Sequence, residues 1–168
     1  PAAPAQDLAI YGQISDFSFQ NQSGIEVSRA SLDGTIWVAD FFFTRCPTIC
    51  KRLSLSMKDL AERTPPGADV RFVSFTVDPE FDQPPVLLKY AKTLGLPLER
   101  WSLIQGSQKE LANLCRNSFQ LALGEEMDEE GNIMHSAKFV LVDGAGRARG
   151  WFSGLDKDEV PALDSALA

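Results

Sequence analysis

The sequence is poor in the residues from which proteins that bind polyanions are built. Lysine and arginine together number 16 against 23 acidic residues, which leaves a formal net charge of −7, and there is a single histidine. Nucleic-acid phosphates and anionic membrane surfaces both favour an excess of lysine and arginine. The composition therefore argues against a nucleic-acid or membrane-surface partner, and we expect proteins or ions instead.

The chain also lacks a run of the roughly 20 apolar residues that a membrane-spanning helix needs. The longest candidate, residues 36–43, is short and carries Asp40. The first residues (PAAPAQ) are typical of a linker. We interpret residues 1–12 as a linker or trimmed boundary, with a signal or anchor removed upstream, and residues 13–168 as one domain with enough apolar residues for a core of its own.

Cysteines are few and odd in number. Three of them cannot all pair, so a disulfide scaffold explains them poorly, and a redox or metal-binding function for two of them fits better. Cys115 lies among apolar residues at helical spacing. We predict that Cys115 is a core residue and assign it no chemistry.

Apolar periodicity predicts strands that alternate with helices. Residues 35–43 (TIWVADFFF) and 70–77 (VRFVSFTV) are typical of strands buried on both faces. The pattern further predicts a β-hairpin over 17–27, helices over 48–63, 84–94, 108–119 and 157–167, and strands over 101–104, 137–142 and 147–152. This order favours an α/β fold, a thioredoxin-like three-layer sandwich with a central mixed sheet and an additional N-terminal β-hairpin.

Cys46 and Cys50 stand where the first buried strand meets the helix that follows it. Residues at i and i+4 lie one helical turn apart, so both sulfurs can face one point and share a metal or a disulfide. The helix N-terminus and the neighbouring Arg45 should favour the thiolate, which is both metal ligand and nucleophile. Two inert core cysteines are the alternative, but a strand-to-helix turn that contains Pro47 is a poor place for them.

His135 follows an acidic stretch, residues 125–130, which we interpret as a solvated loop, and it precedes the strand predicted from residue 137. In the predicted topology that strand neighbours the one before Cys46, so His135 can reach the cysteines if the adjacent loop folds over them. A lone histidine is more often an ordinary surface or core residue. Geometry alone leaves these two interpretations even.

Asp78 and Asp82 follow the second buried strand, at the same end of the sheet as the cysteines. Either carboxylate can orient His135 or tune a metal from beyond its direct ligands. Capping of the turn and of the next helix is an equally good interpretation.

Three segments with these residues occur in one small domain, namely 38–50 (VADFFFTRCPTIC), 72–82 (FVSFTVDPEFD) and 135–143 (HSAKFVLVD). In this combination and order they resemble the Sco/SenC family of copper proteins, from about residue 14 to the C-terminus. The resemblance implies a thioredoxin-like fold with an extra hairpin, and copper held by Cys46, Cys50 and His135. It also implies a metallochaperone that delivers copper to the dinuclear copper site of cytochrome c oxidase, or reduces the cysteines of that site, or does both.

The donor set agrees with what the resemblance implies. Two soft thiolates suit Cu(I), and an added imidazole gives a site that also holds Cu(II). Zinc fits less well, because no obvious general base accompanies the ligands. A disulfide between the two cysteines would block metal uptake, so the site should need reduction before loading.

Other functions stay open. The same two sulfurs suit a thiol-disulfide oxidoreductase or a redox sensor without obligatory metal transfer, so enzyme activity is undecided. A peroxiredoxin-like peroxidase fits less well, because Thr44 stands two residues before Cys46 where that family places its threonine three before. A protein-binding module without chemistry would leave the cysteines and the histidine unexplained.

The family also implies where and with what the protein acts. Its partner would be the copper-bearing subunit of cytochrome c oxidase or another copper donor or acceptor. The expected setting is extracytoplasmic, the bacterial periplasm in preference to the mitochondrial intermembrane space. There the protein would be a monomer, attached to the membrane only through the removed N-terminal anchor.

Overall fold

The computed structural model describes residues 8–46, 49–121, 123–127, 133–135, 137–156 and 158–167, and only the backbone of residues 123–127, 133–135 and 165. Eight strands form one mixed sheet in the order β1-β10-β9-β4-β5-β6-β2-β3. β5 is parallel to both β4 and β6, and the other pairs are antiparallel. The strands are β1 (Gly12–Gln13), β2 (Ser18–Asn21), β3 (Glu26–Ser28), β4 (Ile36–Phe42), β5 (Val70–Thr76), β6 (Trp101–Gln105), β9 (Lys138–Val142) and β10 (Arg147–Ser153).

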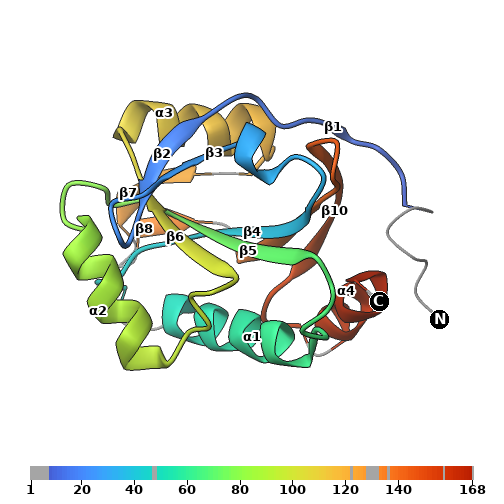
Figure 1. Ribbon diagram of the computed structural model, residues 1–168. Helices are drawn as coiled ribbons and strands as arrows, with labels where there is room; N and C mark the ends of the chain where they lie inside the picture. The colour runs from blue at the N-terminus through green and yellow to red at the C-terminus, as the bar shows by residue number, and fades with distance from the viewer. Residues whose placement is uncertain are drawn as a thin grey trace.

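Helices cover both faces of this sheet (Figure 1). On one side lie α1 (Ile49–Arg63), α2 (Pro84–Leu94) and α4 (Glu159–Leu167), and on the other lies α3 (Gln108–Asn113), which continues into a π-helical turn, Leu114–Ser118. The predicted α/β sandwich is thus confirmed, as is the N-terminal hairpin, in which β2 pairs with β3. No helix in the described part of the chain is long and apolar enough to span a bilayer.

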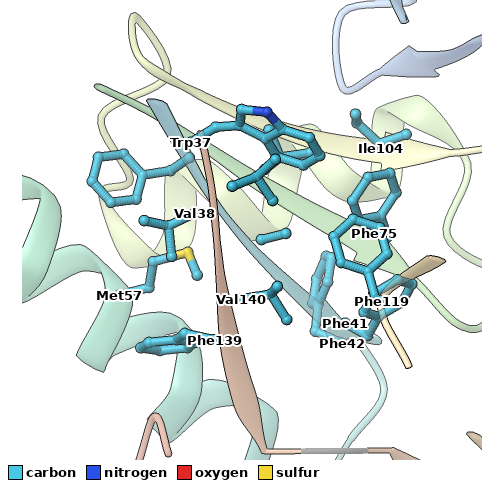
Figure 2. Close-up of a cluster of buried hydrophobic side chains, with 14 of the residues drawn as sticks. Trp37, Val38, Phe41, Phe42, Met57, Phe75, Ile104, Phe119, Phe139 and Val140 are labelled. Atoms are coloured by element: carbon cyan, nitrogen blue, oxygen red, sulfur yellow. The ribbon is translucent and has the colours of Figure 1, made fainter. Parts of the chain in front are cut away.

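Strand β4 is buried on both faces because its successive side chains enter different cores. On the α3 side, the ring of Phe41 stacks on that of Phe75 with centroids 5.1 Å apart and meets Phe119 at 5.4 Å (Figure 2). The next residue, Phe42, points the other way and lies 5.4 Å from the Tyr90 ring of α2. This double burial fixes the position of the strand that leads to Cys46.

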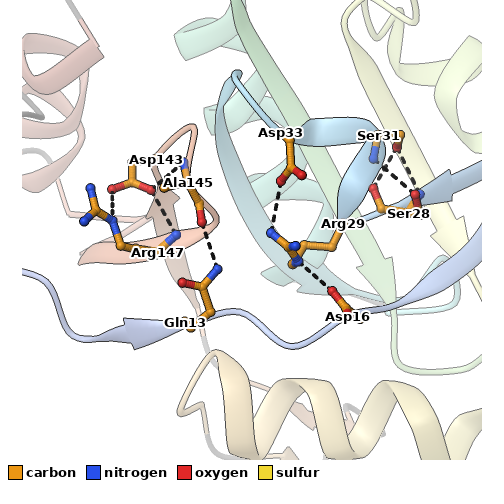
Figure 3. Close-up of polar contacts among 9 residues, drawn as sticks. All are labelled: Gln13, Asp16, Ser28, Arg29, Ser31, Asp33, Asp143, Ala145 and Arg147. Atoms are coloured by element: carbon orange, nitrogen blue, oxygen red, sulfur yellow. Dashed lines mark hydrogen bonds and ion pairs between the residues drawn. The ribbon is translucent and has the colours of Figure 1, made fainter.

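The chain before the hairpin is tied to the turn between β9 and β10. Strand β1 pairs with β10, and Gln13 Nε2 donates to the carbonyl of Ala145 at 2.8 Å (Figure 3). Arg149 Nε donates to the carbonyl of Ala9 at 3.1 Å, and its Nη1 bonds Asp143 at 2.9 Å. Residues from Leu8 onward therefore contact the sheet, while the domain boundary at residue 13 stays a prediction.

A second, two-stranded sheet was not predicted. It pairs β7 (Leu123–Met127) with β8 (Ile133–His135). The interpretation of the acidic stretch as a loop is therefore wrong for residues 125–127, while residues 128–130 lie outside the described residues. The reason is physical: a two-stranded ribbon is joined by backbone hydrogen bonds, so charged side chains can occupy it without the alternation that indicates a half-buried strand.

The side chain of Ser107 caps the N-terminus of helix α3, and removing it should lower the stability of the protein. Ser107 Oγ accepts a hydrogen bond from Glu110 N at 3.2 Å and donates to the Glu110 carboxylate at 2.5 Å. Ser107→Ala leaves an N-terminal amide of the helix without this acceptor, so the free energy of unfolding should fall by about 1 kcal/mol in urea titrations. Ser107→Asp, which keeps an acceptor, is the matched control and should restore most of the loss.

Candidate dithiol and metal site

The two cysteines lie at the turn from β4 into α1. Strand β4 ends at Phe42, and α1 begins at Ile49, after Pro47 and Thr48, which lie outside the described residues. The backbone N–H of Cys50 donates to Cys46 Sγ with an N–S distance of 3.4 Å. Cys46 is partly exposed, whereas Cys50, in the first turn of α1, is only 1% exposed. The structure therefore brings the two cysteines together, with one facing outward and one inward.

Asp82 fixes the segment that leads to Cys46. Its fully buried carboxylate accepts hydrogen bonds from the backbone N–H of Thr44 at 3.0 Å, from Thr76 Oγ1 at 2.6 Å and from the Thr44 hydroxyl. Burial raises the pKa of Asp82, and the bonds from Thr44 and Thr76 act in the opposite direction. The carboxylate thus joins the end of β5 to the residue two positions before Cys46.

Asp78 fixes the next residue, Arg45. Arg45 Nη2 and Nε bond one Asp78 oxygen at 2.7 and 2.9 Å, and its guanidinium lies 4.2 Å from the centre of the Phe81 ring. Phe81 is 43% exposed, so an aromatic ring and a cation form the surface beside the cysteines. Asp78 and Asp82 also close a turn, since Asp82 N–H donates to the Asp78 carbonyl at 2.9 Å. A direct effect of either carboxylate on a metal or on His135 stays a prediction.

The expected preference for thiolate is wrong for Cys50. Burial raises the pKa of the Cys50 thiol, the charges of Cys46 and Asp40 act in the same direction, and the hydrogen bond with the Phe43 backbone only partly opposes them. Arg45, which was expected to favour thiolate, is engaged with Asp78 and Phe81. Desolvation of the inner sulfur therefore outweighs the helix N-terminus.

The burial of the three cysteines predicts an order of reaction with an alkylating reagent. Cys115 is confirmed as a core residue at 1% exposure, and burial raises its pKa to about 12. In the reduced native protein, iodoacetamide should modify Cys46 at least about ten-fold faster than Cys50 or Cys115. Mass spectrometry of peptides from timed reactions measures this order, and equal labelling of Cys46 and Cys115 before unfolding would contradict it.

The backbone places His135 near the same end of the sheet. Strand β9 is antiparallel to β4, with Ala39 opposite Val140, so β9 begins at the end where β4 leads to Cys46. His135 is the last residue of β8, three residues before β9. The predicted neighbourhood of the two strands is confirmed. The His135 side chain lies outside what the structure describes, so a site of three ligands stays a prediction.

No group of three potential metal-ligating side chains is close enough to hold an ion among the side chains that the structure describes, of which His135 is not one. Two sulfurs on one turn already suit a soft ion or a disulfide. The described residues define a pair of neighbouring cysteines that follows the C-terminal end of β4, an inner strand of a thioredoxin-like sheet.

One buried group near this pair was not assigned from the sequence. Asp40 lies within β4, is 1% exposed, and has one carboxylate oxygen without a hydrogen-bond partner among the described residues. The signal in the sequence was a single charged residue inside an otherwise apolar strand. Such a residue requires a compensating partner or a function.

Comparisons with known proteins agree with this combination of fold and cysteine pair. The family model described as SCO1/SenC matches residues 8–165. The SCO1 protein homolog of Bacillus subtilis is 37% identical over 146 residues, which cover 86% of this chain and 75% of that protein. The chain belongs to the SCO1/SenC family, as its three sequence segments predicted.

Solved structures extend the similarity. BsSco, described with a disulfide switch and as a member of the Sco family of cytochrome c oxidase assembly proteins, is 35% identical, with a TM-score of 0.83 over 96% of this chain and 94% of that one. A SCO1/SenC family lipoprotein from Bacillus anthracis is 29% identical, with a TM-score of 0.84 over 92% of each chain. Copper-bound ScoI from Bradyrhizobium japonicum, 23% identical, shares the fold, with a TM-score of 0.76 over 92% of this chain and 96% of that one.

Proposed function

We propose that this protein is a copper metallochaperone that holds one copper ion through Cys46, Cys50 and His135. It delivers the ion to the dinuclear copper site of cytochrome c oxidase, or reduces the cysteines of that site, or does both. The observation that carries the proposal is the contact between Cys50 N and Cys46 Sγ at 3.4 Å, which holds two sulfurs on one turn. Family membership supports it, because a relative in the same family has been solved with copper bound.

The donor set fits copper as cargo. Two sulfurs suit Cu(I), and an imidazole nitrogen extends the site to Cu(II). The buried Asp82 and the ion pair of Asp78 with Arg45 hold the segment before Cys46, so the outer sulfur keeps its position when metal arrives or leaves. Partial exposure of Cys46 gives a partner's thiolates access for ligand exchange.

Thiol-disulfide exchange is the second candidate, and the different exposure of the two cysteines favours it. An outward sulfur suits attack on a partner disulfide, and an inward sulfur four residues later suits resolution of the mixed disulfide. The disulfide switch described for BsSco is consistent with such chemistry in a relative. Oxidation to the disulfide removes both sulfur ligands, so the same pair would couple redox state to metal loading.

Titration of the reduced protein with Cu(I) and Cu(II) beside His135→Ala separates these functions. We expect about one copper per chain, a sulfur-to-copper charge-transfer band and a Cu(II) paramagnetic resonance spectrum with nitrogen and sulfur ligands. Loss of the imidazole should weaken Cu(II) binding by about a hundred-fold, because removal of an outer partner of a ligand already costs ten- to a hundred-fold. Unchanged reduction of a model disulfide by the variant would assign the thiol chemistry to the cysteines alone.

Lys138→Ala is the matched control for this titration. Lys138 begins β9, three residues after His135, and its ion pair with Glu159 is long, at 3.8 Å, and half-exposed. The control should bind copper as the wild type does. A His135→Ala variant that retains both the spectrum and the affinity of the wild type would overturn the three-ligand site and leave the dithiol function.

The compartment belongs to the same proposal. We place the protein outside the cytoplasm, in the periplasm, attached through a segment upstream of residue 13 and acting as a monomer. The lipoprotein in the same family supports this location. Fractionation of cells that make the full-length protein should recover it with membranes. Release by a protease added outside the inner membrane should leave the domain from about residue 8 intact, because residues from Leu8 onward are bonded to the sheet.

A further inference from the structure

An exposed aromatic ring and a cation lie beside the outer cysteine. The guanidinium of Arg45 lies 4.2 Å from the centre of the Phe81 ring, and two of its nitrogens bond Asp78. All 11 phenylalanines of the sequence lie in the described part of the chain, and Phe81 alone among them is exposed. A ring left in water gives up the burial that stabilises the fold through the others. Folding alone therefore does not explain an aromatic residue at this position.

Asp78 orders the cation of this pair. One oxygen of its carboxylate bonds both Nε and Nη2 of Arg45, and the Asp78 side chain is only 14% exposed, whereas that of Arg45 is 53% exposed. Arginine and aromatic residues are enriched among the residues that dominate binding in protein interfaces. Side chains that are ordered in advance lose less entropy when a partner binds. Arg45 and Phe81 thus have the composition and the rigidity of an interface centre.

Two further cations follow the inner cysteine. Lys51 and Arg52, in the first turn of α1, are exposed, and their side chains have no ion pair or hydrogen bond within the described residues. This turn contains no acidic residue, although the first turn of a helix favours acidic side chains and disfavours basic ones. The two cations therefore do not stabilise the helix. Leu55, one turn after Lys51 on the same helix face, is 40% exposed.

These side chains lie on both sides of the turn that carries the cysteines. Residues 44–56 contain three cations and no acidic residue. On the segment 78–82, one aspartate is paired with Arg45, another is fully buried, and Glu80 is the exposed acidic residue. The exposed, unpaired charge of the two segments is therefore positive, in a chain with a net charge of −7. We call the set the docking surface: Arg45, Lys51, Arg52, Leu55 and Phe81.

We propose that the docking surface binds a partner protein that is acidic around its own exposed thiol or disulfide, an inference that rests on the proposed exchange at Cys46. The ring of Phe81 and the guanidinium of Arg45 form the centre of the contact, and the two cations of α1 form its charged rim. An acidic partner is repelled by the net charge of the whole chain and attracted to these cations. It therefore meets the protein with the outer sulfur facing it.

Two synthetic peptides probe the docking surface on the reduced, copper-free protein. In both, a leucine precedes a cysteine activated as its 2-thiopyridyl disulfide, with glutamates around it in the acidic peptide and glutamines in the neutral one. The thiolate of Cys46 attacks the peptide sulfur, the S–S bond breaks and pyridine-2-thione leaves, so stopped-flow absorbance gives the second-order rate. Division by the rate with dithiothreitol corrects for the intrinsic reactivity of each peptide.

The acidic peptide should react about ten-fold faster than the neutral peptide at low salt, because the cations raise its local concentration at the outer sulfur. The ratio of the two corrected rates should approach one at about 1 M salt, where the Debye length is only about 3 Å. This ratio compares two peptides on the same sulfur. A change in the reactivity of Cys46 itself therefore cancels.

Lys51→Glu and Arg52→Glu test the charged rim. Each should lower the ratio of the two rates about three- to ten-fold at low salt, because rim charges act mainly on the rate of association. Lys109→Glu is the matched control, since it makes the same change in total charge. Lys109 is exposed on α3, which lies on the opposite face of the sheet from α1 (Figure 1), so the ratio should stay within about two-fold of the wild type.

Phe81→Ala tests the centre of the contact. It should slow both peptides about five-fold and leave their ratio unchanged, because the ring offers apolar area to the leucine and no charge. The small disulfide 4,4′-dithiodipyridine does not cover the ring, so its rate should stay near that of the wild type. Ile25→Ala, which removes an equally exposed apolar side chain beside the turn between β2 and β3, is the matched control. Wild-type peptide rates in Phe81→Ala would overturn the contact centre.

Two further results would overturn different statements. If the wild type does not prefer the acidic peptide, or if Lys51→Glu and Arg52→Glu keep that preference, the docking surface is wrong. The thiol chemistry then still stands, provided that Cys46→Ala loses the reaction with both peptides. If Cys46→Ala releases pyridine-2-thione as fast as the wild type, the exchange at Cys46 is wrong and the inference falls with it. Circular dichroism and thermal unfolding verify that each variant is folded.

Discussion

Cys50→Ala is expected to abolish tight copper binding by the reduced protein, and Cys46→Ala is expected to do the same. The two sulfurs are the soft ligands of the proposed site and lie on one turn, with Cys50 N 3.4 Å from Cys46 Sγ. A single thiolate cannot retain Cu(I) against competing thiols, so affinity should fall by at least about a hundred-fold. Competition titration with a chromogenic Cu(I) chelator measures the loss.

Cys115→Ala is the control that removes a sulfur without touching the site. Cys115 is buried within the π-helical turn, where its Sγ lies 3.9 Å from the carbonyl oxygen of Leu121. This variant should bind one Cu(I) with wild-type affinity and lose only some stability. Wild-type affinity in either Cys46→Ala or Cys50→Ala would refute a copper site built on the pair.

Protonation of Asp40 should make the free energy of unfolding depend on pH. The pKa of this carboxyl group rises from 3.8 to about 7 on folding because burial disfavours the charged form. Between these values the folded protein holds a proton that the unfolded chain releases, so the free energy of unfolding falls as pH rises. The contribution of the protonated Asp40 to the free energy of unfolding is full below about pH 4 and is lost progressively up to about pH 7. It amounts to at most about 4 kcal/mol.

Urea titrations at intervals from pH 5 to pH 8, for the wild type and Asp40→Asn, measure this slope. The variant has no carboxyl group at this position, so its stability should vary much less across the range. Asp78→Asn provides the comparison, because Asp78 forms an ion pair with the half-exposed Arg45 and should leave the slope near neutral pH in place. If the free energy of unfolding of Asp40→Asn falls with pH as steeply as that of the wild type, Asp40 is not the group responsible.

The central strands and the helices between them were predictable because buried segments show apolar runs or apolar residues at helical spacing. β4, β5 and the helices after them match the apolar runs and the helical spacing closely. Gly95, which has φ 66° in the left-handed region, caps the C-terminus of α2. The ribbon of β7 and β8 leaves no such mark, because its apolar residues do not alternate with polar ones at the period of a half-buried strand. Periodicity detects faces that pack on a core and misses strands that do not.

The contact between the two cysteines was predictable from the sequence, and their electrostatics were less so. The i, i+4 spacing correctly indicated that Cys46 and Cys50 would be neighbours, and the antiparallel register of β9 with β4 agrees with the placement expected for the residues after His135. Sequence spacing carries no information on depth, so the burial that raises the pKa of Cys50 was missed. For the same reason the pairing of Arg45 with Asp78, rather than with a thiolate, emerged only from the structure.

The N-terminal segment is bonded to one edge of the sheet, away from the turn that carries the two cysteines. Arg149, Asp143 and Gln13 fix residues 8–13 to the β1–β10 edge, and Figure 1 shows the first described residues on the side of the molecule opposite to the start of α1. Tension applied through the chain before Leu8 therefore acts on that edge. The turn with Cys46 and Cys50 carries none of it, so a domain held at this end can be pulled or reoriented while the spacing of its two sulfurs stays the same.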